Sequence, residues 1–291
     1  MLRSVEIELF VQFSPPFANT FSVKVLNFSR VCCESTTRTS QKIPLPKQLI
    51  SVLLIPLQVS MIKFEEKSQY AFVSTFHELI ETEFIDSINA LCWKRNLVGN
   101  FKEIVSKLQL KENITEISIN DLNQLHLSEN GKLARAIITK DFKLLSEYGA
   151  QPSLNLLKNY ERDDDFDFIS TDVYSYHVDR SPIGSDTFLC TYFGASSDII
   201  PNDQVQQKIL IPEIRAQLKK LHNGPESEFA EFLKENFFDL HYQEKPNAKP
   251  TNLGNGNLWR LSVDHPNQKV LPCVHRAPIE NEGEFRLLLI C

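Results

Sequence analysis

The stretch DVYSYHVD at residues 172–179 opens the region that decides the fold. It is rich in Val and Tyr, which favour strands. Further short apolar runs follow, with turn-forming segments between them: 187–193 (TFLCTYF), 258–263 (LWRLSV), 270–275 (VLPCVH) and 285–290 (FRLLLI). Short strands separated by turns predict a sandwich or a jelly roll. We therefore expect an α+β protein whose jelly-roll core, a double-stranded β-helix, spans residues 161–291.

The chain before this core has a helical pattern. Between residues 72 and 91, apolar side chains recur at the spacing of one helix face: Phe76, Ile80, Phe84, Ile88 and Leu91. Helices are also expected at 101–108, 133–148 and 153–160, and Ser153 is a candidate cap for the last. The acidic run 161–167 marks a boundary. Residues 61–160 are thus expected to form a helical N-terminal part that packs on the core.

A helical insertion is expected inside the strand-rich half. Residues 204–221 have apolar side chains near helical spacing, although Pro212 breaks or restarts the helix. A second helix is indicated by Phe229, Phe232, Leu233 and Phe237. Residues 247–257 are rich in Asn, Gly and Pro, which predicts a loop.

Residues 1–60 do not resemble the rest of the chain. Ser, Thr and Pro are scattered through them without a clear period, and Met1 and Met61 are the only methionines. We expect a poorly ordered extension, or the product of a start codon placed too early.

Three side chains form a candidate metal site. His177 and Asp179 are two residues apart, so on a strand they point to the same face. His275 would supply a third ligand from a distant strand. Two neutral imidazoles and a carboxylate on one face of an ion are the facial triad of non-haem Fe(II) oxygenases. The alternative is a buried His–Asp pair joined by hydrogen bonds, with no metal.

Arg286 is the candidate anion-binding residue. It shares a strand face with Leu288 and Ile290, and an unpaired guanidinium facing a core would be costly to bury. A co-substrate carboxylate would match its fork. The alternative is an exposed arginine on an edge strand. Arg276 is the rival anion binder, but it directly follows His275 and so faces the other way.

Two other residues near these motifs are weaker candidates. Tyr192 could hydrogen-bond a bound carboxylate, although buried tyrosines usually satisfy their hydroxyl locally. His265 sits in an apparent turn between Asp264 and Pro266, which favours a solvated loop residue over a ligand.

The motifs resemble those of a known superfamily. H-x-D, a distal His and an Arg about ten residues later look like the Fe(II)/2-oxoglutarate-dependent oxygenases. More narrowly, residues 84–291 resemble a bacterial family of uncharacterised proteins, through motifs that occur in order: Cys92-Trp93-Lys94-Arg95, His177-Val178-Asp179, Leu189-Cys190-Thr191-Tyr192, His275-Arg276-Ala277-Pro278 and Arg286-Leu287-Leu288-Leu289. The superfamily resemblance implies His177, Asp179 and His275 as Fe(II) ligands and Arg286 as the 2-oxoglutarate anchor.

The composition and the absence of certain motifs disfavour several classes of partner and of chemistry. A formal net charge of −6 argues against a sequence-independent grip on nucleic acid. Six cysteines without CxxC spacing indicate a reducing cytoplasm and no disulfide framework. No secretory signal is evident, and the apolar run 49–61 is too short and too polar to span a membrane. Nucleotide-binding and acyl-transfer motifs are missing from the sequence.

Three functions are compatible with these patterns. The first is an Fe(II)/2-oxoglutarate-dependent oxygenase of the hydroxylase or demethylase type, with a small-molecule co-substrate and an unidentified substrate. The second is a cupin-like module that binds a metal or ligand without oxidation. The third is an interaction protein whose His and Asp are structural.

We expect a shortened chain of residues 61–291 to be as stable as the full chain, because the helical pattern begins after Met61. Thermal denaturation of both proteins measures this. Insolubility or a much lower melting temperature of the shortened chain would mean that residues 1–60 complete the core.

Overall fold

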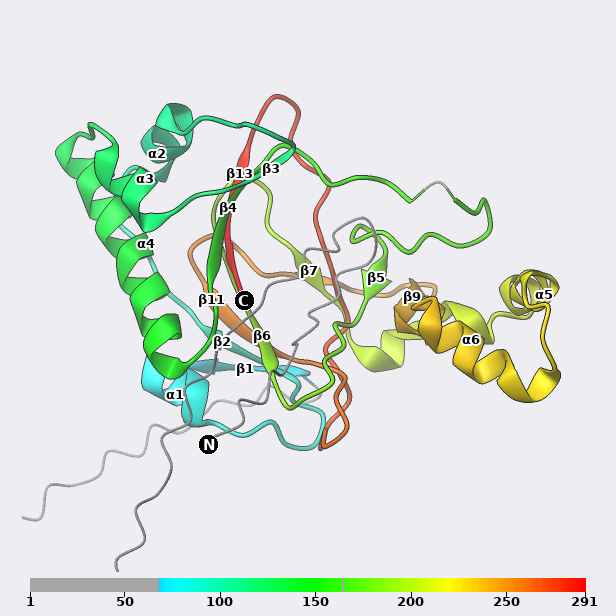
Figure 1. Cartoon of the computed structure of the whole chain (residues 1–291). Coiled ribbons are helices and arrows are strands. Elements are labelled where there is room, and N and C mark those ends of the chain that lie inside the picture. Colours follow the sequence, from blue (N-terminus) through cyan, green and yellow to red (C-terminus); the bar gives the residue numbers. More distant parts are fainter. Residues whose placement is uncertain (1–67, 164) are drawn as a thin grey trace, which may run out of the picture. The chain divides into compact units, whose positions relative to one another are not determined.

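The computed structural model describes residues 68–163 and 165–291 (Figure 1). The expected extension at 1–60 lies outside these residues. In the described part, the strands form two sheets, A and B. Sheet A has the order β1-β2-β11-β6-β13-β4-β3, and sheet B has the order β10-β7-β12-β5-β9-β8. The expected mixture of helices with antiparallel sheets is confirmed, apart from one parallel pair, β1–β2.

The bounds of the strands follow chain order within each sheet. Sheet A contains β1 (Tyr70–Val73), β2 (Ala90–Trp93), β3 (Ile114–Glu116), β4 (Ser153–Leu157), β6 (Asp186–Phe193), β11 (Leu258–Ser262) and β13 (Arg286–Ile290). Sheet B contains β5 (Tyr176–His177), β7 (Asp198–Ile199), β8 (Val205–Gln207), β9 (His241–Glu244), β10 (Thr251–Asn252) and β12 (His275–Arg276). Because β1–β4 belong to sheet A, residue 160 does not separate a helical part from a strand-rich part.

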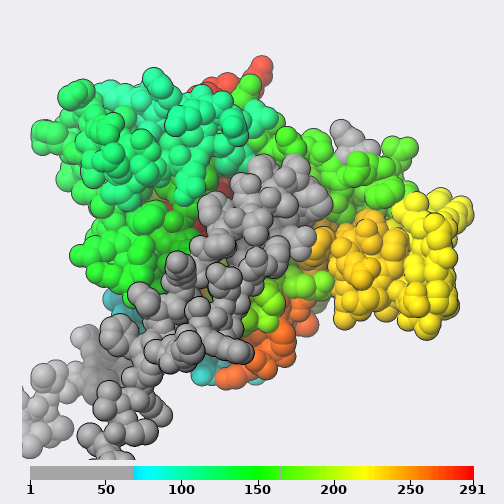
Figure 2. Space-filling model, in the orientation of Figure 1, coloured from blue at the N-terminus to red at the C-terminus, as the bar shows by residue number. Residues whose placement is uncertain are grey.

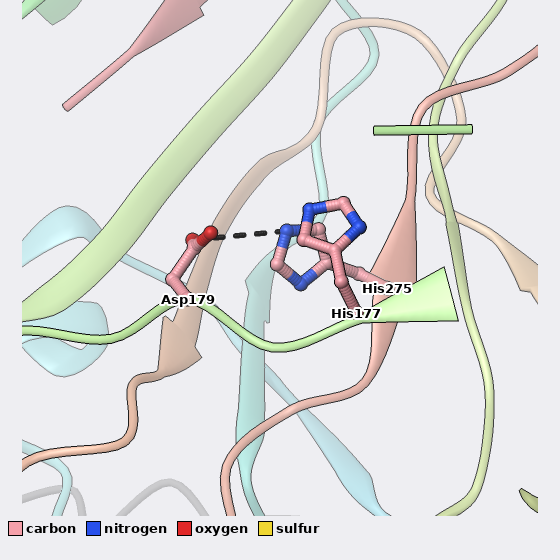
Figure 3. Close-up of side chains that lie close together, drawn as sticks. All are labelled: His177, Asp179 and His275. Carbon is pink, nitrogen blue, oxygen red and sulfur yellow. Dashed lines mark ion pairs between the residues drawn. The ribbon is translucent and has the colours of Figure 1, made fainter. Parts of the chain in front are cut away.

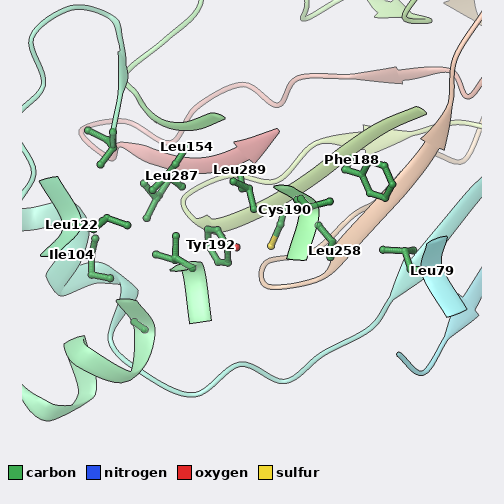
Figure 4. Packing of buried hydrophobic residues seen from close by; sticks show 14 of the residues in the cluster. Leu79, Ile104, Leu122, Leu154, Phe188, Cys190, Tyr192, Leu258, Leu287 and Leu289 are labelled. Atoms are coloured by element: carbon green, nitrogen blue, oxygen red, sulfur yellow. The ribbon is translucent and has the colours of Figure 1, made fainter. Parts of the chain in front are cut away.

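Four helices cover the outer face of sheet A (Figure 1): α1 (Phe76–Glu81), α2 (Phe101–Lys107), α3 (Ile119–Gln124) and α4 (Glu129–Tyr148). Their buried side chains, such as Leu79, Ile104 and Leu122, pack on Leu154 and Leu289 of the sheet (Figure 4). This is the largest apolar cluster of the described residues, and it fixes which way each strand of sheet A faces.

The alternation of β6 shows how sheet A is oriented. Phe188, Cys190 and Tyr192 point into the helix-covered cluster, whereas Leu189 points the other way. Leu189 joins a second cluster that also contains Ile199 of sheet B. The inner face of sheet A therefore lies toward sheet B.

An insertion between β7 and β10 carries the remaining helices. It contains β8, α5 (Pro212–Leu221), α6 (Phe229–Glu235) and β9. The helix expected at 204–221 is shorter than predicted, because residues 205–207 pair with β9 as strand β8 and the helix starts at Pro212, which occupies its first position. A second helix follows as predicted. The helices have their own aromatic cluster around Phe229 and Phe238, and Figure 2 shows their surface in yellow.

Two predicted helices were wrong. Residues 72–91 form β1, the short helix α1 and β2, because Thr75 caps α1 and the chain turns back after Thr82. Their apolar residues do pack in the core, so the periodicity found the buried positions but not the element. Residues 153–157 form strand β4 between β3 and β13, where pairing on both sides overrides the helix propensity of the leucines.

Two predicted strands are shorter than expected. Only Tyr176–His177 of 172–179 is a strand, because the Asp172 carboxylate accepts hydrogen bonds from the backbone N–H groups of Tyr174 and Ser175 and forms a turn. Only His275 of 270–275 belongs to β12. Within the expected loop 247–257, Thr251–Asn252 pairs with β7.

The described residues contain no candidate membrane-spanning helix and no disulfide bond. None of their helices is long and apolar enough to cross a bilayer. Their four cysteines are free: Cys92, Cys190, Cys273 and Cys291. Burial raises the pKa of Cys92 and Cys190 to about 12, so these thiols stay protonated near neutral pH and act as small apolar groups.

A buried ion pair connects α4 to the end of β2. Arg95 Nη1 lies 2.7 Å from Asp141 Oδ1, and the Tyr192 hydroxyl donates to Asp141 Oδ2 at 2.7 Å. The Arg95 and Asp141 side chains are only 8% and 2% exposed. Each buried charge is therefore compensated by the charge of its partner.

We expect Asp141→Ala to lower the free energy of unfolding by about 3–5 kcal/mol, because it leaves the Arg95 charge buried without its partner. Urea denaturation measures this. Glu147→Ala on the same helix is the control: its pair with Lys143 is solvent-exposed, so stability should barely change. Equal losses in the two variants would contradict a special role for the buried pair.

Candidate metal centre

The two histidines of the candidate site are neighbours across sheet B. His275 of β12 is directly opposite His177 of β5 in an antiparallel pair, so both side chains are on the same face. Their ring centroids are 4.5 Å apart. Tyr176, Val178 and Val274, the residues beside them in the chain, pack together on the opposite face. The alternation of both strands thus turns the imidazoles inward.

Backbone carbonyls hold both rings in the same way. His177 Nδ1 lies 2.7 Å from the carbonyl oxygen of Ser175, and His275 Nδ1 lies 3.1 Å from that of Cys273. Because a carbonyl oxygen only accepts, each Nδ1 donates. In the neutral ring the lone pair is then on Nε2. This is how metal-binding histidines are usually oriented.

Asp179 approaches the same point from just beyond β5. Its Oδ2 lies 3.7 Å from His275 Nε2 (Figure 3). The hydroxyl of Thr187, on the inner face of β6, donates to the same carboxylate. Sheet A therefore helps to position the candidate ligand that follows β5.

The electrostatics suit a neutral His177 and an ionised Asp179. Burial, together with the nearby His275, lowers the pKa of His177 to about 4. Burial works to raise the pKa of Asp179, but His275, His177 and the Thr187 hydroxyl outweigh it and hold that pKa below its usual value. Both groups are thus in their metal-binding forms at neutral pH.

The donor set fits a divalent ion. One ligand atom from each of His177, Asp179 and His275 lies within 4.8 Å of the other two. Neighbouring ligands in a facial arrangement are about 3 Å apart, because two bonds of about 2.1 Å meet at roughly a right angle. The side chains would therefore have to move together by up to about 2 Å to hold one ion. Two nitrogens and one carboxylate oxygen match the donor set of non-haem Fe(II) sites.

Arg286 is a buried cation on the inner face of sheet A. It is 1% exposed. Its Nη2 donates to Ser197 Oγ at 2.9 Å and to Thr191 Oγ1 at 3.2 Å, whereas Nε and Nη1 have no hydrogen-bond partner among the described residues. Burial lowers the pKa of Arg286 despite the opposing effect of Tyr160 and Glu280. Two donors of the side chain thus lack a well-aligned partner among residues 68–163 and 165–291, although the Tyr160 hydroxyl is close to the guanidinium.

Arg286 and the histidines border the same apolar cluster. Leu157 is directly opposite Arg286 in the β4–β13 pair, and Ile199 is directly opposite His275 in the β7–β12 pair. Leu157 and Ile199 belong to one cluster between the sheets. The guanidinium and the imidazoles therefore face the same inter-sheet space.

Arg276 lies on the outer face of sheet B and so does not reach the inter-sheet space. It ion-pairs with Asp198 at 3.2 Å, and its guanidinium lies over the Tyr176 ring at 4.4 Å. Both partners are on the outer side of sheet B. A surface pocket of about 350 Å³ is lined there by Arg276 and Asp198 and includes none of the three candidate ligands.

Tyr192 is not brought to the candidate site. Its ring stacks on Phe101 with centroids 5.5 Å apart, and its hydroxyl donates to Asp141. It belongs to the cluster on the outer face of sheet A, opposite Thr191 and Leu189. The structure gives it a role in packing α2 and α4.

The sequence indicates a helical or boundary segment without metal-ligand spacing around His241, and this expectation is wrong. His241 of β9 is directly opposite His177, so three imidazoles form a row across β12, β5 and β9. His241 is 1% exposed, and neither ring nitrogen has a hydrogen-bond partner among the described residues. No local motif contains it. Only the strand pairing reveals it.

Comparisons with protein-family models, with curated proteins and with solved structures found no match to this chain. The resemblance to oxygenases therefore remains a prediction from the motifs, and the geometry above stands independently of it.

We expect His177→Ala to abolish stoichiometric Fe(II) binding without unfolding the protein, because it removes one of three donors rather than a core side chain. Metal analysis after anaerobic loading, together with circular dichroism, measures both effects. His265→Ala is the control, since that histidine lies outside the cluster and accepts a hydrogen bond from the Asn267 backbone. Full metal content in His177→Ala would refute the ligand assignment.

Proposed function

We propose that this protein is an Fe(II)/2-oxoglutarate-dependent oxygenase. The observation that carries the proposal is the combination of a two-His, one-carboxylate cluster with a buried, half-satisfied arginine facing the same inter-sheet space. A metal-binding module alone would not need the second feature, because a buried guanidinium costs several kcal/mol unless an anion pairs with it.

The order of the strands supports a jelly roll of the double-stranded β-helix type. Within sheet A, β11-β6-β13-β4 are adjacent, and within sheet B, β10-β7-β12-β5 are adjacent. Numbering these eight strands along the chain, with the insertion strands β8 and β9 left out, gives the orders 6-3-8-1 and 5-4-7-2. This is the interleaving that two Greek keys produce in a jelly roll.

In this proposal, His177, Asp179 and His275 hold Fe(II). When bound, the iron and 2-oxoglutarate supply an O2-dependent oxidation in which loss of CO2 from the 2-oxo acid drives attack on a substrate C–H bond. The protein supplies the remaining requirements. Ser175 and Cys273 fix the histidine rings, Thr187 holds the carboxylate, and the inter-sheet cluster keeps bulk water away.

Arg286 orients the co-substrate. Its Nη1 and Nε hydrogens lie on different edges of the guanidinium, so Nη1 can donate to the distal carboxylate of a dicarboxylic 2-oxo acid while Nε–H is left for a second acceptor. Ser197 and Thr191 accept from Nη2 and so keep the fork in place. A 2-oxo acid without a distal carboxylate would leave the arginine unpaired and should bind weakly.

We expect Arg286→Met to weaken 2-oxoglutarate binding at least about tenfold, because each charged hydrogen bond contributes about 1.5–3 kcal/mol and 1.4 kcal/mol is one decade. Iron binding should survive. Anaerobic titration of 2-oxoglutarate into the Fe(II) protein, followed by the metal-to-ligand absorption band, measures affinity.

Arg276→Met is the matched control, since it removes the same charge from the other face of sheet B. It should bind 2-oxoglutarate as the wild type does. If Arg286→Met binds equally well, or if the wild type gives no band at millimolar 2-oxoglutarate, the cupin-like module becomes the better description.

A further inference from the structure

His241 lies on the opposite side of the candidate metal centre from the arginine. In sheet B the order is β7-β12-β5-β9, with His275 and His177 on the two middle strands. Arg286 contacts Ser197, which directly precedes β7, whereas His241 is on β9. Strands are about 4.8 Å apart, so β7 and β9 are separated by roughly 14 Å.

His241 is buried, and neither of its ring nitrogens has a hydrogen-bond partner among residues 68–163 and 165–291. A neutral imidazole has one donor and one acceptor, and leaving either unpaired in a dry interior is unfavourable. Its ring centroid is 5.9 Å from that of His177. It is not among the three donors that converge within 4.8 Å, so it stands beside the metal ligands and is not one of them.

The inner face of the β8–β9 pair leads from His241 to solvent. Gln243, two residues along β9, is on the same face and is exposed. Gln206 of β8 is directly opposite Gln243 and is exposed as well. On the opposite face of this pair, Val205 and Tyr242 pack with Tyr176, and Gln207 and Glu244 lie beside them. The sequence thus places amides and an imidazole on the face that adjoins the candidate site.

No carboxylate lies on this face of β8 or β9. Glu244 is directly opposite Val205 and therefore belongs to the other face. The ionisable groups that act on His241 are His177 and Lys208, both of them basic. Since the described residues offer His241 no acceptor, an oxygen-bearing or anionic group of a bound molecule would supply the missing partner.

We infer that His241 is a substrate-positioning residue. It donates a hydrogen bond to an acceptor-rich or anionic group of the primary substrate. That group lies beside the metal, on the side away from Arg286. The inference rests on the proposed function. The substrate enters over the inner face of β8 and β9, past Gln206 and Gln243. The co-substrate occupies the β7 side.

The test uses the full chain loaded with Co(II), and azide as a small anionic probe of the open metal position. His241→Leu and His241→Phe remove the donor, while His241→Asn and His241→Gln each keep an amide donor near one ring-nitrogen position. His126→Leu, which changes an exposed histidine, is the matched control. Absorption of the Co(II) centre gives the affinities for azide and, separately, for 2-oxoglutarate.

We expect His241→Leu and His241→Phe to weaken azide binding by at least about fivefold, or about 1 kcal/mol. At least one amide variant should stay within about twofold of the wild type, and Co(II) and 2-oxoglutarate affinities should be unchanged in every folded variant.

Other outcomes are informative in distinct ways. Equal azide affinity in the donor-free variants, or a wild type that binds Co(II) but no azide, overturns the inference alone. Loss of Co(II) from His241→Leu makes His241 a ligand, and loss of 2-oxoglutarate affinity assigns it to the co-substrate; either result overturns the positioning role. A wild type that binds no Co(II) removes the proposed function and the inference together.

Discussion

The pairing register of β12, β5 and β9 is the constraint on which the candidate site depends. Because side chains alternate along a strand, a slip of one residue would turn His177 and Asp179 outward and bring Tyr176 and Val178 inward. The apolar cluster on the outer face opposes that slip, since Tyr176, Val178 and Val274 would all lose their packing. The hydrophobic effect on one face thus fixes the chemistry on the other.

The same division of faces explains how sheet A tolerates Arg286. The outer face of β13 contributes Leu287 and Leu289 to the large helix-covered cluster, and this burial holds the strand in register. The inner face can then carry a buried cation whose desolvation costs several kcal/mol. Burying Arg286 on a central strand lowers stability. Such a costly residue, close to the His177, Asp179 and His275 side chains, is expected in a binding site rather than in a structural core.

The sequence was informative where the signal is local. The H-x-D spacing places two side chains on one face, and β6, β11 and β13 are apolar runs long enough to be recognised as strands. It was uninformative where a position depends on distant pairing. Strand β4 has helix-forming leucines, and only β3 and β13 on its two sides make it a strand. The placement of Tyr192 and of His241 likewise depends on the face and register of their strands, which no spacing within the chain encodes.

The three candidate ligands differ in how firmly the fold holds them. The rings of His177 and His275 are each tied to a backbone carbonyl two residues earlier, and the His275 side chain is only 10% exposed. Asp179 lies beyond the end of β5, is 26% exposed, and is positioned mainly by the Thr187 hydroxyl. The two imidazole rings are therefore preorganised by the backbone, whereas the Asp179 carboxylate is held less firmly. Oxygen ligands adapt more easily than fixed imidazoles to ions of different size, so the hydrogen bond from Thr187 would limit how far Asp179 could move toward a bound ion.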